Sequence, residues 1–164
     1  MKNLARLIPL TLITAAALAA PKTFVANNYG ATGDGTTLDT AAIQKAIDAA
    51  AKAGGTATLK PGTYLTGSLF LKSGVTLDVP EGVTLIGSEK LEDYPMLPTR
   101  IAGIEMTWPA ALINSRDQHN VTLTGKGTID GDGPIWWKSY WDLRKTYEPR
   151  GCAGPPTTTP AARA

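Results

Sequence analysis

Residues 120–137 read NVTLTGKGTIDGDGPIWW, and this stretch decides the fold. Val121 and Leu123 alternate with threonines, and β-branched residues return at Thr128 and Ile129 after a Gly-Lys-Gly corner. Alternation at period two is typical of short β-strands. Glycine weakens an isolated strand, and it is best explained where the chain bends sharply or where another backbone approaches closely. The pattern therefore predicts two short strands joined by a tight corner, as in one coil of a β-solenoid.

Similar strand-like runs, separated by glycines, fill the sequence upstream. The triplet Val-Thr-Leu begins at residues 75, 83 and 121. Short strands joined by short turns could form a meander, a sandwich or a parallel solenoid, and the periodicity does not choose among them. The expected strands lie within residues 56–59, 61–65, 68–71, 75–79, 83–86 and 112–114.

Residues 88–111 interrupt this rhythm with three prolines, and the excursion is too long for a simple turn. Loops of this length in a compact domain are often functional. We therefore expect residues 88–111 to form a wall of a site or a lid.

One amphipathic helix is expected over the alanine-rich residues 41–53. Asp39 or Thr40 is expected to cap it, because a short side-chain oxygen can accept a hydrogen bond from a free amide of the first turn. Gly54-Gly55 is expected to end it, since glycine takes a left-handed C-terminal position readily. Three residues are expected to share the buried face: Ile43, Ile47 and Ala50.

Residues 1–19 are predicted to be a secretory signal peptide, with a basic start, an apolar run and small residues before a cut after Ala19. The apolar run is too short to span a bilayer comfortably. The leader holds Lys2 and Arg6, so its removal reduces the 16 basic residues to 14, against 14 acidic ones. The remaining chain is nearly neutral, so its charge gives no reason to expect nucleic-acid binding. We expect export to the periplasm or the extracellular space, with no membrane segment after cleavage.

Two further features exclude other classes of protein. Residues 30–37 read GATGDGTT, which superficially resembles a phosphate-binding loop. The loop lacks the lysine that must reach the phosphates, and no βαβ unit follows, so we expect no nucleotide binding. Cys152 is the only cysteine, which excludes an internal disulfide.

Four motifs, taken in order, resemble the N-terminal part of bacterial glycoside hydrolase family 28, the polygalacturonase-like enzymes. They are YGATGDG at residues 29–35, DTAAIQKAID at 39–48, PGTYLTG at 61–67, and GTIDG at 127–131 followed by Trp136-Trp137. Several pectate lyase-like β-helix proteins share the first two motifs, whereas the combination is more specific. The resemblance covers roughly residues 24–150. Leu38 departs from it, because the family often has aspartate there, and we expect only a small effect on the start of the helix.

The resemblance implies a mainly β fold, a right-handed parallel β-helix capped at its N-terminal end by the helix over residues 39–53. It also implies hydrolysis of α-1,4 bonds between galacturonate units of pectin, with inversion. One carboxylic acid then protonates the leaving oxygen while a second carboxylate activates water. The implied reaction needs no metal and no other cofactor. The expected partner of the full-length parent is a pectic polysaccharide, not nucleic acid or membrane.

The catalytic motifs of the family are missing from this chain. Family members carry Asn-Thr-Asp, an Asp-Asp pair, Gly-His-Gly and Arg-x-Lys downstream, and none of these occurs here. We therefore assign no catalytic residue, no metal ligand and no substrate-binding residue, and we expect the chain by itself to be inactive. The alternatives are a fragment of a β-helix polysaccharide lyase or a non-catalytic carbohydrate-binding β-helix module.

Local candidates have ordinary structural explanations. Asp130 and Asp132 could present carboxylates to one side of an extended segment, but turn aspartates that bind nearby backbone are the commoner case. A calcium loop starting there would lack oxygen ligands, because Pro134 and Trp141 occupy ligand positions. His119 lies in the turn expected at residues 117–120, and we expect it to face solvent.

The four tryptophans could each stack on a sugar ring, because an aromatic face suits the apolar face of a pyranose. Packing of their segments against the flank of the solenoid explains them at least as well. The residues are Trp108, Trp136, Trp137 and Trp141.

Residues 151–164, GCAGPPTTTPAARA, lose all apolar periodicity. One interpretation is a flexible linker. The other is a shifted reading frame near Arg150, because one possible set of codons for this tail encodes LRWAADYD in another frame, and LRWAADYD looks like a continuation of the family sequence. On the second interpretation residues 20–150 are only the first coils of a longer domain. Each solenoid coil covers its neighbour and the last one needs a cap, so we expect a marginally stable monomer or an aggregate.

Overall fold

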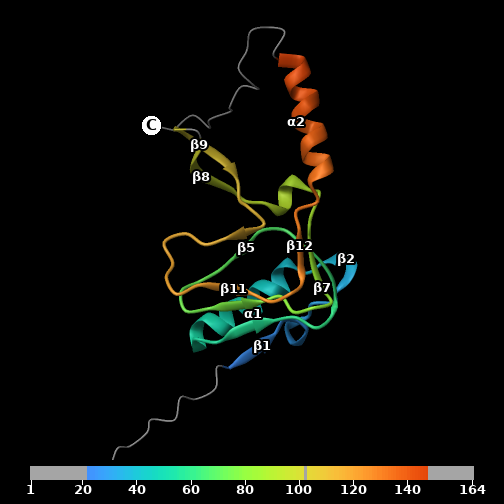
Figure 1. The fold of residues 1–164 in the computed structure, drawn as a ribbon. Coiled ribbons are helices and arrows are strands. Elements are labelled where there is room, and N and C mark those ends of the chain that lie inside the picture. Colours follow the sequence, from blue (N-terminus) through green and yellow to red (C-terminus); the bar gives the residue numbers. More distant parts are fainter. Residues whose placement is uncertain (1–21, 102, 148–164) are drawn as a thin grey trace, which may run out of the picture.

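The computed structural model describes residues 22–101 and 103–147, so the predicted signal peptide and the tail lie outside the described residues. Parallel strands form three ladders that wind around a shared interior (Figure 1). One ladder contains β1 (Thr23–Val25), β3 (Thr56–Thr58), β6 (Thr76–Asp78) and β11 (Thr122–Thr124). The second contains β2 (Asp34–Leu38), β4 (Gly62–Thr66), β7 (Val83–Gly87) and β12 (Thr128–Asp130). The third contains β5 (Leu69–Phe70) and β10 (Ile113–Asn114).

The parallel register stacks equivalent residues of successive coils in rows. Leu77 pairs with Leu123, and Leu85 pairs with Ile129. Leu77 and Leu85 are fully buried, whereas Leu123 and Ile129 in the last described coil are 49% and 41% exposed. Parallel pairing over one coil excludes the meander and the sandwich, because both need antiparallel neighbours. Each row is therefore buried by the coil that covers it.

Helix α1 (Thr40–Ala53) starts close to its predicted N-terminus and ends at Gly54, which has a left-handed φ of +63°. The prediction that a side chain of Asp39 or Thr40 caps α1 is wrong. Asp39 occupies the N-cap position without a side-chain hydrogen bond to the first turn, and Thr40 is already helical. The buried face of α1 comprises Ile43, Ala46, Ile47 and Ala50, which includes all three predicted residues.

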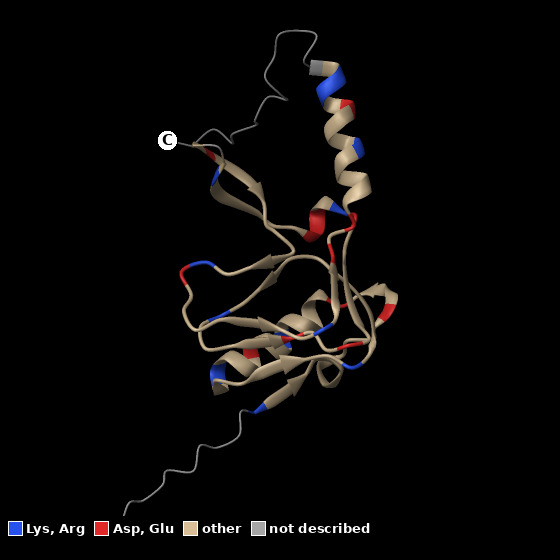
Figure 2. Cartoon of the chain, viewed as in Figure 1, with Lys and Arg blue, Asp and Glu red and all other residues tan. Residues whose placement is uncertain are grey.

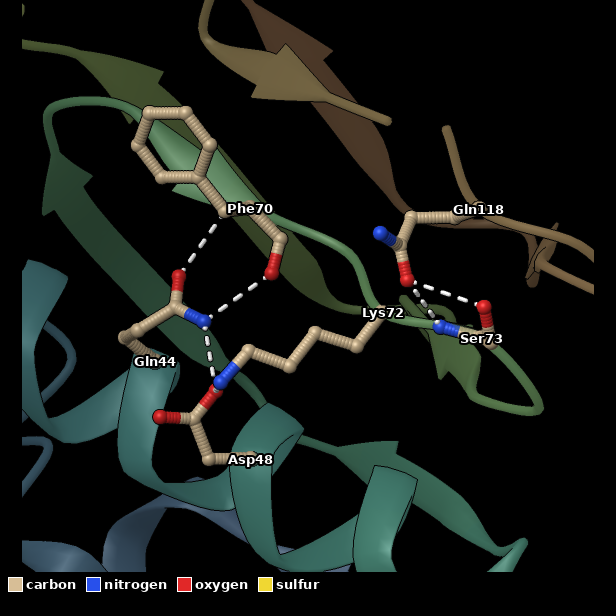
Figure 3. A network of polar contacts seen from close by, with 6 residues as sticks. All are labelled: Gln44, Asp48, Phe70, Lys72, Ser73 and Gln118. Carbon is tan, nitrogen blue, oxygen red and sulfur yellow. Dashed lines mark hydrogen bonds and ion pairs between the residues drawn. The ribbon is translucent and has the colours of Figure 1, made fainter. Parts of the chain in front are cut away.

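Helix α1 covers the edge of β5 that faces away from β10 (Figure 3). The side-chain amide of Gln44 donates to the Phe70 carbonyl and accepts from the Phe70 amide, both at 2.9 Å. The Thr40 hydroxyl accepts from the Gly67 amide at 2.7 Å. These contacts satisfy backbone groups that a neighbouring strand would otherwise satisfy, and they protect the edge from pairing with another chain. That α1 caps the whole N-terminal end of the stack stays a prediction.

Polar contacts continue from α1 across the coils in Figure 3. Lys72 lies 2.7 Å from Asp48, and the Gln118 side chain accepts from the Ser73 amide at 2.7 Å. Burial raises the pKa of Asp48, but hydrogen bonds from Lys72 and Gln44 outweigh burial and hold that pKa below its ordinary value. Basic and acidic residues are interspersed over the coils in Figure 2.

Replacing Gln44 by alanine is expected to lower the free energy of unfolding by about 2 kcal/mol, because two backbone groups of Phe70 lose their partner. Urea unfolding followed by tryptophan fluorescence measures the change. Lys45→Ala is the control, since Lys45 is exposed on the same helix and such surface changes stay within about 0.5 kcal/mol. Equal midpoints for the two variants would contradict this role of Gln44.

Residues 88–111 form an antiparallel hairpin rather than an irregular loop. A 3₁₀ turn (Leu91–Asp93) leads into β8 (Met96–Ile101), which pairs with β9 (Ile104–Pro109) and places Leu97 opposite Trp108. The hairpin projects from the stack between β7 and β10 (Figure 1). The predicted excursion is therefore confirmed, but its regular structure was not predicted.

A second helix, α2 (Gly133–Tyr147), follows β12 and extends away from the coils (Figure 1). This helix was not predicted from the sequence, although Pro134 in the first turn and the Lys138–Asp142 pair at 2.8 Å both favour a helix. Neither α1 nor α2, the helices of the described ranges, is long and apolar enough to cross a membrane. Several large side chains of α2 are exposed: Ile135, Trp137, Tyr140, Trp141 and Leu143.

Candidate functional site

Two adjoining hollows lie where the β8–β9 hairpin meets the stack. The first, of about 730 Å³, is bounded by the hairpin, by Phe70 of β5 and by Asn114 at the end of β10. The second, of about 450 Å³, lies beside Tyr94 and Trp136. Both volumes fall within the range typical of ligand sites, roughly 300–1,000 Å³. Residues 108–111 line both hollows, so Trp108 borders each of them.

The first hollow has a charged rim with more positive than negative side chains. Arg100 lies 3.7 Å from Glu105, and Arg116 donates from Nη1 to the Pro98 carbonyl at 3.2 Å. The Arg116 contact ties the segment after β10 to strand β8. All three charged side chains are largely exposed, so the rim favours anions without burying an unpaired charge.

Asn114 shapes the floor of the first hollow. Its side-chain oxygen accepts from the Ala111 amide at 3.0 Å, and its nitrogen donates to the carbonyls of Ala111 at 2.6 Å and Leu69 at 3.2 Å. These bonds fix the turn between β9 and β10. Asn114 is therefore a structural residue of the site, and its polar atoms are already paired.

The second hollow is aromatic. Trp136 packs edge-on against Tyr94, with ring centroids 5.6 Å apart and an interplanar angle of 89°. Tyr94 is 8% exposed, and its hydroxyl donates to the Ser88 carbonyl at 2.8 Å. Burial, followed by the negative charges of Asp93 and Asp132, raises the pKa of Tyr94. The contact with Tyr94 holds the Trp136 ring in place at the wall of the hollow.

The raised pKa of Tyr94 predicts that stability falls in alkaline solution. An unfolded tyrosine ionises near pH 10, so above that pH the unfolded chain releases this proton first, and its free energy falls relative to that of the folded chain. The contribution is fully present below about pH 10 and is lost as the pH rises through the folded value. In Tyr94→Phe, unfolding free energies measured from pH 8 to pH 11 should decline less steeply. An unchanged slope would contradict the shift.

The structure brings together two of the four tryptophans. Trp108 is 52% exposed and lies between the hollows, and Trp136 lines the second one. Trp137 and Trp141 lie on α2 and line neither hollow. Trp141 instead contacts Tyr140 and Arg144.

Asp130, Asp132 and His119 line neither hollow, although Gly131, between the two aspartates, lines the second one. The Asp132 amide donates to Asp130 Oδ1 at 3.0 Å, which is the turn contact favoured by the Asp-Gly-Asp sequence. His119 is exposed, with Nδ1 3.2 Å from the Ser73 hydroxyl. Within residues 22–101 and 103–147, no group of three or more His, Cys, Asp or Glu side chains is placed to hold a metal ion.

The structure explains the glycine-rich loop through Asp39. The buried Asp39 carboxylate accepts from the amides of Thr32 at 2.8 Å and Gly33 at 2.9 Å, and also from the Thr32 hydroxyl. The amides that a phosphate would need are thus bound within the protein. Sequence reasoning missed this role of Asp39, and it missed Arg100 and Arg116, for which no local motif exists.

Comparisons with known proteins agree with this architecture. Residues 24–92 match the family described as "Rhamnogalacturonase A/epimerase, pectate lyase-like". The exo-poly-alpha-D-galacturonosidase of Dickeya chrysanthemi is 40% identical over 140 residues, which are 80% of this chain and 23% of that protein. The family 28 exopolygalacturonase of Yersinia enterocolitica superposes with a TM-score of 0.61 and 41% identity, over 69% of this chain and 21% of its own. The hyperthermoactive exopolygalacturonase of Thermotoga maritima superposes with a TM-score of 0.66 and 26% identity, over 88% of this chain and 38% of its own.

This chain therefore spans about a quarter of the length of its curated Dickeya relative. The solved structures confirm the predicted right-handed parallel β-helix, since they superpose on the coils described above. Together, these matches and the ordered motifs at residues 29–35, 39–48, 61–67 and 127–131 show that the chain is related to the N-terminal part of the polygalacturonase-like proteins of glycoside hydrolase family 28, within the pectate lyase-like β-helix group.

Proposed function

We propose that this chain provides the N-terminal coils of an exported glycoside hydrolase that cleaves polygalacturonate by inverting acid/base hydrolysis. The similarity to the Dickeya galacturonosidase supports the proposal most directly, because it extends over 80% of this chain at 40% identity. In this proposal residues 1–19 direct export, residues 20–150 belong to the β-helix domain, and residues 151–164 lie outside the family sequence.

The chain by itself is proposed to be inactive. An inverting glycosidase needs two carboxyl groups roughly 6.5–9.5 Å apart, one as acid and one as base. Glu105 is the single acidic residue that lines either of the two hollows, and it faces Arg100 at the rim. The described coils thus provide a wall for a polysaccharide but no catalytic pair at that wall.

A chimeric enzyme tests the proposal. Residues 22–147 would replace the matching segment of the Dickeya galacturonosidase, and release of reducing ends from polygalacturonate would be measured. We expect the chimera to hydrolyse polygalacturonate, whereas the present chain alone releases nothing. Circular dichroism and soluble yield show whether the chimera has folded.

Other outcomes favour the alternatives. A folded chimera without activity on polygalacturonate would contradict the proposed substrate. A calcium-dependent, ultraviolet-absorbing unsaturated product would indicate a β-helix lyase. Tight binding of pectic polymers by the unaltered chain, combined with an inactive chimera, would indicate a binding module.

A further inference from the structure

We propose that the two hollows around Trp108 bind neighbouring units of a galacturonate chain, with Trp108 stacking on a sugar ring and with Arg116 and Arg100 pairing with its carboxylate. The inference rests on the proposed function for the identity of the polymer. It adds a binding site to residues that no sequence motif identified.

Trp108 is held as a platform by the strand that carries it. It lies on β9 opposite Leu97 of β8, and just beyond β9 the Ala110 amide donates to the Pro95 carbonyl at 2.9 Å. These contacts hold the base of the hairpin, where β8 starts and β9 ends, yet Trp108 remains 52% exposed and lines both hollows. A rigid, exposed aromatic side chain offers large contact area at low entropic cost on binding.

The charged rim selects an acidic sugar. Two guanidinium groups and one carboxylate line the first hollow, and a second carboxylate, that of Asp117, lies 3.7 Å from Arg116 outside the lining. Arg116 uses Nη1 for the Pro98 carbonyl, and its Nε lies 3.7 Å from Asp117, so most of its five N–H donors remain for a ligand. An arginine fork matches a carboxylate with two parallel hydrogen bonds. A neutral sugar chain would leave these donors unpaired.

The second hollow extends the platform to an adjacent sugar. Trp136 and Tyr94 supply an apolar wall on the far side of Trp108, and the edge-on contact between them fixes the Trp136 ring. Charge on one side of Trp108 and apolar rings on the other suit a polymer whose units each have a carboxylate and an apolar ring face. The site would therefore hold a segment of chain, not a single free sugar.

Binding of trigalacturonate to the full chain tests the inference, with the neutral trisaccharide of galactose as the comparison ligand. Titration calorimetry at low salt should give at least about tenfold tighter binding for trigalacturonate. Trp108→Ala should weaken that binding about tenfold, and Arg116→Met should remove most of the preference for the acidic ligand. Added salt should reduce the same preference, because the rim is exposed. Trp141→Ala, on α2, should leave binding unchanged.

The inference is overturned if Trp108→Ala and Arg116→Met bind trigalacturonate as the parent does, or if the neutral ligand binds equally well. If the chain alone aggregates, the same substitutions in the chimera give the comparison through KM for polygalacturonate. If the chimera is active and neither substitution changes its KM, the binding site inferred here is contradicted, whereas the proposed function still stands. If the chimera is inactive but Trp108→Ala still weakens binding of trigalacturonate, the proposed function is contradicted, whereas the inferred binding site still stands.

Discussion

Gly125→Ala is expected to lower the free energy of unfolding by about 3 kcal/mol or more. Gly125 has a φ of +110°, and an alanine Cβ there would lie 2.0 Å from the Val79 carbonyl oxygen of the preceding coil. Val79 cannot shift easily, because its amide donates to Thr124 at 2.9 Å and its carbonyl accepts from Gly127 at 2.8 Å. Left-handed backbone and overpacking each contribute roughly 1–3 kcal/mol.

Gly74→Ala separates these two effects. Gly74 also has a positive φ, +75°, but nothing lies within 4 Å of the position that its Cβ would occupy. We expect backbone strain alone, about 1 kcal/mol. Urea unfolding at low protein concentration, followed by tryptophan fluorescence, compares the variants. Equal losses at the two positions would show that the close approach of coils at Gly125 is unimportant.

Asp39→Ala is expected to lower the free energy of unfolding by about 3 kcal/mol. Asp39 is 2% exposed, and its removal leaves the amides of Thr32 and Gly33 without the carboxylate that they bind within the protein. Each unsatisfied buried donor contributes roughly 1–3 kcal/mol. Asp39→Asn retains one side-chain oxygen of similar position, so we expect it to recover part of the loss.

Asp34 is the matched control for Asp39. Its carboxylate also accepts from two amides, those of Thr36 and Thr37, and from the Thr37 hydroxyl, but it is exposed to solvent. Water can replace these bonds, so Asp34→Ala should have a clearly smaller effect. Hydrogen bonds from Thr37 and Thr36 hold the pKa of Asp34 below its ordinary value. Its contribution is therefore present above about pH 4 and is lost as the pH falls below that. Similar losses for the two aspartates would contradict the importance of burial.

The local pattern of the sequence was enough to predict α1 and most strands of the coils, but not β2 (Asp34–Leu38), whose glycine-rich start has the composition of a turn. Periods of 2 and 3.6 reflect burial on one face, and the residues predicted to be buried at Ile43 and Ile47 are fully buried. Helix α2 gave no such signal, because its large side chains point to solvent and leave no apolar stripe. The hairpin was obscured by its prolines.

The candidate site was predicted only in part. Trp108 was identified by residue type, since an aromatic ring can stack wherever it is exposed. Arg100 and Arg116 were not, because 16 positions separate them in the sequence and only the fold of the hairpin brings both to one hollow. Asp39 was given the wrong role, since a helix N-cap and an acceptor for a preceding loop need the same residue type. The signal peptide and the origin of the tail stay predictions.

The one-coil register also sets an order of assembly. From β3 onward, each strand of the coils except β5 pairs with a strand that precedes it in the sequence, and the edge of β5 that β10 leaves open is covered by α1. A nascent chain leaving the ribosome can therefore complete one turn before the next is translated, with α1 already positioned against β5. When coils form in order from the N-terminus, the apolar side chains of each new coil are exposed only until the next coil covers them. This order shortens the time during which residues such as Leu123 and Ile129 can take part in aggregation.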